Sequence, residues 1–252
     1  MEIHQVKGRH VNSYIVLEAS GMFVVDVAWK GEKYVLGHIT EVLRRSPAEV
    51  RLVTCTHGDP DHAGGVAELA RACGAKVAYP YATHSFMNRF INDPTGILFR
   101  FATAVLESFR PRAWQMYANP QRSQKAQQLP ALEPEDLMAA DRLEDCLDDE
   151  DLEYDYLLKN RYSLPGFDGW QTLHTPGHTW HSCCYYHQAS GSLVTGDTLL
   201  GSKKKGKVVT ASIYSNPLQL RRSVRRLRKL NPAAIYPGHG SVFHGTDLLK
   251  HL

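Results

Sequence analysis

The chain has 252 residues, 43% of them hydrophobic, and a formal net charge of only +3 at pH 7. This length and hydrophobic content allow a substantial buried core and exclude a disordered protein. The small net charge does not indicate nucleic-acid binding. Residues 1–16 lack the basic and apolar regions of a signal peptide, and no run of about 18 apolar residues predicts a membrane span. We therefore expect a soluble cytoplasmic protein that binds neither nucleic acid nor a membrane.

Predicted strands and helices alternate in the first third of the chain. The apolar runs 22–27, 51–56 and 76–79 are rich in β-branched residues and predict buried strands. Between these runs, apolar residues recur at helical spacing in 35–46 and 62–74. The expected inward positions of the first helix are Val35, Ile39, Val42 and Leu43. This order of elements predicts an α/β fold.

The last third of the chain has the same alternation. Residues 181–187 and 192–195 are typical of two strands that form a hairpin around a Gly-containing turn. Asn216 suits the N-cap of a helix, and Pro217 suits its first position. Residues 233–236 predict the strand that follows this helix.

Residues 84–165 interrupt this alternation. They begin with the apolar segment 95–109 and become strongly acidic in 133–155. We interpret 84–165 as a mostly helical insertion within a single domain that spans residues 1–252. Its acidic side chains are most simply a solvated face.

Four predicted strands each end in a Gly- or Pro-containing loop that carries a metal-binding type of side chain. The residues in these four loops are His57, His178, Asp197 and His239. The first loop, THGDPDHAGG (56–65), adds Asp59, Asp61 and His62. Strand ends hold such side chains at fixed points, so that distant segments can converge on one cleft. Because histidine and aspartate bind zinc, iron and manganese, the seven residues predict a site for two metal ions.

The ordered motifs THGDPDHAGG, TPGHTWHS, TGD and PGHG resemble those of the metallo-β-lactamase superfamily. VNSYIV followed by FVVDV resembles the opening strands of that family. The resemblance covers residues 11–83 and 165–245 and leaves the middle of the chain unmatched. It implies an αββα sandwich of two mixed sheets, with helices outside and metals at one edge. The insertion 84–165 is then expected near the metal cleft.

The resemblance also implies which residues bind the metals. Those for the first metal would be His57, Asp59 and His178. Those for the second metal would be Asp61, His62 and His239, and Asp197 would bridge the two ions. Asp26 matches an acid that supports the metal loop by orienting a histidine or by holding its backbone. An ordinary surface acid at the end of a strand is the alternative for Asp26.

Asp59 departs from the family motif. The usual motif is His-x-His-x-Asp-His, whereas residues 57–62 read His-Gly-Asp-Pro-Asp-His, so a carboxylate replaces an imidazole. Three aspartates and one hydroxide cancel the four charges of two divalent ions, whereas the usual motif leaves one positive charge. A more neutral, oxygen-rich site is a weaker Lewis acid and accepts iron or manganese more readily. We expect two divalent ions per chain, with zinc as the first candidate and iron or manganese as alternatives.

The implied function is a binuclear metal-dependent hydrolase, in which a hydroxide that bridges the metals cleaves a small ester, lactone or thioester. Asp61 would pass a proton to the leaving group. The first alternative is a di-iron redox or oxygen-binding protein, because the flavodiiron branch of the family also has a carboxylate at the position of Asp59. A phosphodiesterase and a non-enzymatic binding module are further alternatives.

Two features beside the motifs are candidates for substrate contact. The lysines at the expected rim are Lys203, Lys204 and Lys205, which would attract anionic substrates, although a solvated loop is the simpler interpretation. His181 is a candidate for lining the pocket, and packing or hydrogen bonding is a better explanation for it than metal binding. The oligomeric state stays open, with a homodimer as one option.

Overall fold

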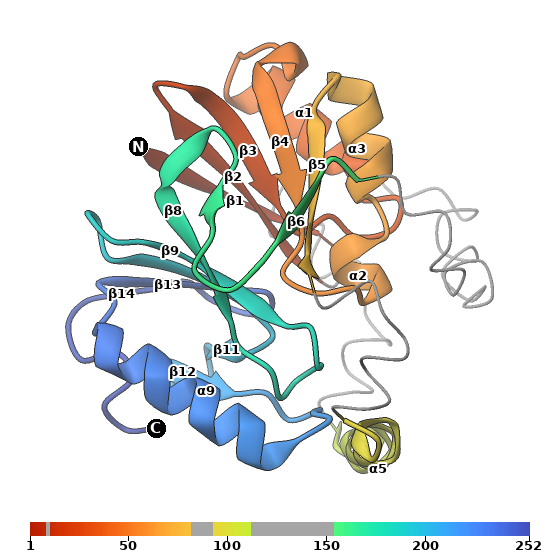
Figure 1. Ribbon diagram of the computed structural model, residues 1–252, viewed down its shortest axis with the longest axis vertical. Helices are drawn as coiled ribbons and strands as arrows, with labels where there is room; N and C mark the ends of the chain where they lie inside the picture. Colours follow the sequence, from red (N-terminus) through yellow and green to blue (C-terminus); the bar gives the residue numbers. More distant parts are fainter. Residues whose placement is uncertain (9–10, 82–92, 112–153) are drawn as a thin grey trace. The chain divides into compact units, whose positions relative to one another are not determined.

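The computed structural model describes residues 1–8, 11–81, 93–111 and 154–252, which form two compact units (Figure 1). Unit 1 comprises the described residues in 1–55, 59–78 and 154–155. Unit 2 comprises those in 56–58, 79–111 and 156–252. The chain thus leaves unit 1 after Cys55 and returns to it at Asp59.

A mixed sheet forms the centre of unit 1. The strands of this sheet that lie in unit 1 are β1 (Glu2–Lys7), β2 (Asn12–Glu18), β3 (Gly21–Val25), β4 (Val50–Thr54) and β5 (Lys76–Pro80). The last two residues of β5 belong to unit 2. The pairs β1–β2 and β2–β3 are antiparallel, whereas β3–β4 and β4–β5 are parallel. Val24 lies opposite Val53, and both are fully buried. The three strands expected in this part of the chain are confirmed.

The helical segments of unit 1 include one irregular turn. They are α1 (Glu32–Gly37), a π-helical turn (His38–Val42), a 3₁₀ turn (Pro47–Glu49), α2 (Pro60–Ala63) and α3 (Val66–Cys73). Val35 and Ile39 are buried as expected, but the prediction for Val42 is wrong, because 63% of it is exposed. The N–H of Leu43 donates to the carbonyl of His38, five residues earlier. This wider turn rotates Val42 away from the buried face.

Backbone hydrogen bonds join the loop 59–65 to residues 26–29 within unit 1. The N–H of Val27 donates to the carbonyl of His62 at 2.7 Å, and that of Trp29 donates to Pro60 at 3.0 Å. The N–H of Gly65 donates to Val27 at 3.0 Å. The backbones approach so closely that a Cβ at Gly65 would overlap the carbonyl oxygen of Ala28. This close approach explains why glycine occupies position 65.

A second mixed sheet forms the centre of unit 2. Its strands, in spatial order, are β14 (Phe243–His244), β13 (Ala234–Pro237), β10 (Ser192–Gly196), β9 (Cys183–His187), β8 (Phe167–His174) and β7 (Ser163–Leu164). Only β10 and β13 are parallel neighbours in this described sheet. The expected hairpin is confirmed as β9 and β10. A separate two-stranded sheet contains β11 (Leu199–Ser202) and β12 (Lys207–Thr210).

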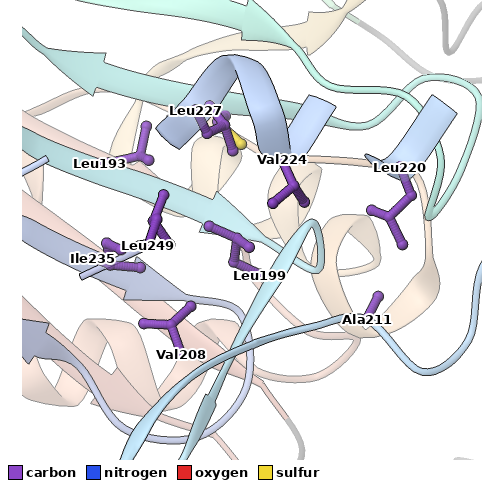
Figure 2. Close-up of a cluster of buried hydrophobic side chains, with 10 residues drawn as sticks. Leu193, Leu199, Val208, Ala211, Leu220, Val224, Leu227, Ile235 and Leu249 are labelled. Carbon is purple, nitrogen blue, oxygen red and sulfur yellow. The ribbon is translucent and has the colours of Figure 1, made fainter. Parts of the chain in front are cut away.

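The helix α9 (Pro217–Leu230) packs against the sheets of unit 2. It begins as expected, since the Asn216 side chain accepts hydrogen bonds from two N–H groups of the first turn and Pro217 follows. Its side chains Leu220, Val224 and Leu227 face buried residues of β9 to β13 (Figure 2). The other members of this core are Cys184, Leu193, Leu199, Val208, Ala211, Ile235 and Leu249. Burial of this apolar surface holds α9 against the strands that carry the candidate metal ligands.

Most of the expected insertion lies outside the described residues, including the acidic stretch up to residue 153. Within its bounds the structure describes α5 (Gly96–Ser108) and β6 (Tyr156–Leu158). The Thr103 hydroxyl of α5 lies 3.3 Å from the carbonyl oxygen of Tyr214 and accepts from the Tyr214 N–H at 3.2 Å. None of the helices in the described ranges has the length and apolar character needed to cross a bilayer.

Gly65→Ala is expected to lower the free energy of unfolding by about 1–3 kcal/mol, because the added methyl group must displace the backbone of Ala28. Gly37→Ala is the matched control, since no atom lies within 4 Å of the added Cβ and the φ of −58° suits alanine. Thermal denaturation followed by circular dichroism should give a lower Tm for Gly65→Ala alone. Equal melting of the two variants would contradict a close backbone contact at Gly65.

Candidate metal centre

The short segment 56–58 fixes His57 within unit 2. The carbonyl of Thr56 accepts a hydrogen bond from the N–H of Cys183 in β9, at 2.9 Å. The N–H of Gly58 donates to Nε2 of His181 at 2.8 Å. His57 is fully buried, and its Nδ1 lies 3.0 Å from the hydroxyl of Thr56. A hydrogen bond at Nδ1 orients the ring so that Nε2 becomes the atom suited to bind a metal.

Three further candidate metal ligands of unit 2 follow the ends of three strands. His178 follows β8, Asp197 follows β10 and His239 follows β13. One carboxylate oxygen of Asp197 lies 3.7 Å from Nε2 of His178 and 3.3 Å from Nε2 of His239. The rings of His57 and His178 meet edge to face, with centroids 4.8 Å apart. These four side chains, the unit 2 cluster, come from four separate segments of the sequence.

The tautomer of neutral His178 follows from its hydrogen bond. Nδ1 lies 2.7 Å from the carbonyl oxygen of Ile213, which only accepts, so Nδ1 carries the proton. In the neutral ring Nε2 is then an acceptor that faces an acceptor oxygen of Asp197. A proton or a cation between the two atoms would remove the repulsion of this pair. Imidazole nitrogen and carboxylate oxygen are both suitable ligands for zinc, iron or manganese.

In unit 1, the His62 ring lies between two carboxylates, with Asp26 at Nδ1 and Asp61 at Nε2. Nδ1 of His62 lies 2.9 Å from a carboxylate oxygen of Asp26, and both side chains are fully buried. This short distance lets the carboxylate of Asp26 fix the position of the His62 ring. Nε2 of His62 faces an Asp61 oxygen at 3.7 Å. Asp59, two residues before Asp61, is the N-cap residue of α2.

Asp26, which contacts His62, has an unusual backbone conformation. Its φ is +61°, in the left-handed region, and its N–H donates to the carbonyl of Thr54 at 2.9 Å. Aspartate tolerates this region better than most residues do, but the conformation costs roughly 1–3 kcal/mol. The turn directs the side chain of Asp26 at His62. Full burial excludes an ordinary surface acid, the alternative that the sequence left open.

The residues expected at the rim differ in their surroundings. His181 is 8% exposed and accepts a hydrogen bond from the backbone beside His57, so hydrogen bonding explains its burial. The three lysines, Lys203, Lys204 and Lys205, lie exposed in the turn between β11 and β12. Their contact with a substrate stays a prediction.

Two contacts of the candidate ligands were not expected from the sequence. The Thr56 hydroxyl contacts His57, and the Ile213 carbonyl accepts from His178. Thr56 directly precedes a candidate ligand, which is a usable signal in a search for supporting residues. The Ile213 contact uses only the backbone, so no type of residue could have indicated it.

Comparisons with known proteins identify the family of this chain. A family model described as the metallo-beta-lactamase superfamily matches residues 6–239. A curated relative, the probable metallo-hydrolase YqjP of Bacillus subtilis (strain 168), is 33% identical over 97 residues. That match covers 36% of this chain and only 30% of the relative.

Solved structures show a likeness over nearly the whole chain. The metallo-beta-lactamase family protein TTHA1429 from Thermus thermophilus has a TM-score of 0.60 at 22% identity, covering 99% of this chain and 75% of that one. TTHA1623 in a di-iron-bound form has a TM-score of 0.56 at 20% identity, covering 100% and 97% of the two chains. The Rm3 metallo-beta-lactamase has a TM-score of 0.54 at 17% identity, covering 94% and 75%. At such identities these likenesses establish the fold alone.

The α/β fold class with two mixed sheets, expected from the sequence, is therefore confirmed. The family model covers most of the 252 residues and contains all the candidate ligands. The chain belongs to the metallo-β-lactamase superfamily.

Proposed function

We propose that this protein is a metal-dependent hydrolase that uses two divalent ions to cleave a small ester, lactone or thioester. One observation carries the proposal: in each unit a histidine Nε2 faces a carboxylate oxygen while its Nδ1 is already engaged. The pairs are His178 with Asp197 in unit 2 and His62 with Asp61 in unit 1. A divalent cation between the two acceptors turns their repulsion into attraction.

Only a short stretch of chain separates His57 of unit 2 from Asp59 of unit 1. Asp59 follows His57 by two residues, so their Cα atoms are at most about 7 Å apart in any conformation. The proposed ligands of the first ion are His57, Asp59 and His178, and those of the second are Asp61, His62 and His239. Asp197, which contacts two histidines of unit 2 through one oxygen, is the proposed bridge.

The side chains of this protein have distinct roles in the proposed reaction. When bound, the two ions would activate a water molecule and polarise the scissile carbonyl. Asp26 and Ile213 hold the rings of His62 and His178 in the orientation needed for binding. The Asp61 side chain is 38% exposed, against 13% for Asp197, and is the group to which we assign proton transfer to the leaving group. Residues 203–205 would attract an anionic substrate from solution.

A di-iron redox or oxygen-binding protein is the second candidate. Asp59 favours it, because an added carboxylate makes the ligand set harder and lowers its net charge. TTHA1623, one of the similar folds, was solved in a di-iron-bound form. Metal analysis with a visible absorption spectrum separates the two functions. A colourless, zinc-containing protein that cleaves esters supports hydrolysis, whereas a ferric band that disappears on reduction supports redox chemistry.

Asp197→Ala is expected to remove metal and reduce the turnover of 4-nitrophenyl acetate more than about 100-fold, because even supporting residues change metal affinity or activity 10–100-fold. The control is Asp168→Ala, which removes an exposed carboxylate from β8 of the same unit. Metal content is measured by mass spectrometry and folding by circular dichroism. Two metals per chain and normal turnover in Asp197→Ala would contradict the proposed bridge. A metal-loaded wild type that cleaves no ester, lactone or thioester would contradict the function.

Asp59→His is expected to shift the purified protein towards zinc, because imidazole is a softer ligand than carboxylate and carries no charge. Gly58 and Pro60, on either side of Asp59, should let the new side chain reach the metal without moving Asp61. Wild type and variant are produced in one medium that contains zinc, iron and manganese, and their metal contents are compared. Asp168→His controls for a histidine added elsewhere. An unchanged ratio of metals in Asp59→His would show that Asp59 does not set the preference.

Asp26→Ala is expected to weaken metal binding about 10–100-fold, because His62 loses the carboxylate that orients its ring. Asp26→Asn should have a smaller effect, since the amide keeps the shape of the carboxylate beside His62 and asparagine tolerates a φ of +61°. Asp247→Ala is the matched control: Asp247 also has a left-handed φ, of +55°, but is exposed. Competition with a chromophoric chelator measures the affinity. The role of Asp26 would be refuted if the Asp26→Ala and Asp247→Ala proteins bound metal equally well.

A further inference from the structure

Unit 2 contains a cavity of about 440 Å³, and most of its lining residues lie outside the predicted motifs. It is lined mainly by apolar surface, with Tyr81 directly after β5, Leu158 in β6 and Trp180 in the loop before β9. Its volume is in the range of small-molecule sites, which are typically apolar with a few polar groups. We call it the Tyr81–Trp180 pocket.

The pocket lies next to a candidate metal ligand of the same unit. His181 lines it and accepts a hydrogen bond from the Gly58 N–H, and the His181 and His57 rings have centroids 6.5 Å apart. A molecule whose reacting bond is near His57 can therefore extend a side group past His181 into the pocket. The pocket is thus placed to select substrates by that group.

Two lining residues carry buried donors that have no partner among the described residues. They are the hydroxyl of Thr172, which is 1% exposed, and the indole N–H of Trp180. Buried polar groups are nearly always hydrogen-bonded, so these two donors indicate a ligand with acceptor atoms. Hydrogen bonds to such a ligand would offset the free energy needed to bury the Thr172 hydroxyl and the Trp180 N–H.

The charges around the pocket favour an anion. Lys159 lines it, and its Nζ lies 4.9 Å from the centre of the Tyr81 ring, at the exposed rim. None of the described lining residues is acidic. Burial lowers the pKa of His174, the hydrogen bond to the Trp180 carbonyl raises this pKa by less, and the charge of Arg226 lowers it further. His174 is therefore neutral at pH 7, and Lys159 supplies the positive charge.

We propose that the Tyr81–Trp180 pocket binds a small, mainly apolar group of the substrate that ends in a carboxylate. The apolar part packs against Tyr81, Leu158 and Trp180. The carboxylate accepts from the two buried donors and faces Lys159. This inference names the substrate class of the proposed hydrolase and rests on that function, although binding to the pocket can be measured without turnover.

The test uses calorimetric titration of the metal-loaded protein with 4-phenylbutyrate and with its neutral analogue 4-phenylbutyramide. The acid is expected to bind more tightly than the amide. Lys159→Met should raise the Kd of the acid about fivefold and leave that of the amide within about twofold, since it removes only a charge. Thr172→Val should raise the Kd of the acid at least about tenfold, because a hydrogen bond to a charged group is lost. Lys207→Met, an exposed lysine of β12, is the control.

The outcomes separate the pocket from the proposed function. Loss of acid binding after chelation of the metals, with no effect of Lys159→Met or Thr172→Val, would place the carboxylate on the metal ions and overturn the pocket assignment. Equal effects of Lys159→Met and Lys207→Met would overturn it as well. If the acid binds with the expected dependence on Lys159 and Thr172 but 4-nitrophenyl esters are not cleaved, the pocket assignment stands and hydrolysis fails.

Discussion

The contact between His62 and Asp26 is the interaction on which the loop of unit 1 depends. Both side chains are fully buried, and their nearest nitrogen and oxygen are 2.9 Å apart. A buried carboxylate is costly unless a donor faces it, and a buried imidazole needs an acceptor, so each requires the other. Three backbone hydrogen bonds between residues 26–29 and the loop 59–65 fix the same geometry. The close approach then leaves no space for a side chain at Gly65.

In unit 2, core packing and backbone hydrogen bonds position the candidate ligands. Its candidate ligands follow β8, β10 and β13, and the apolar core under α9 holds the last two strands in place. The Ile213 carbonyl orients His178, and the next residue, Tyr214, is hydrogen-bonded to Thr103 of α5. Packing in the core and hydrogen bonds at the strand ends thus act on the same few side chains.

Much of the fold and part of the site follow from local patterns in the sequence. The β-branched runs predict β3, β4 and β5 because a buried strand needs such side chains, and Asn216 with Pro217 predicts the start of α9 because both suit the first turn of a helix. The turn at Val42 could not be predicted, since a single π-helical turn does not change the average spacing of apolar residues. Apart from His181, the lining of the Tyr81–Trp180 pocket could not be predicted either. Its residues come from β5, β6, β8 and the loop before β9, and only the tertiary structure brings them together.

His62 and His178 differ in which mutations can disturb them. The acceptor for His62 is a side chain, so a single codon change at Asp26 removes it. The acceptor for His178 is the carbonyl of Ile213, and no exchange of side chain at position 213 removes a backbone oxygen. Substitutions should therefore accumulate more freely around His178 than around His62 as related sequences diverge. Insertions, deletions or a new proline in the segment before α9 should be tolerated less well. They shift the backbone itself and therefore move the Ile213 carbonyl away from His178.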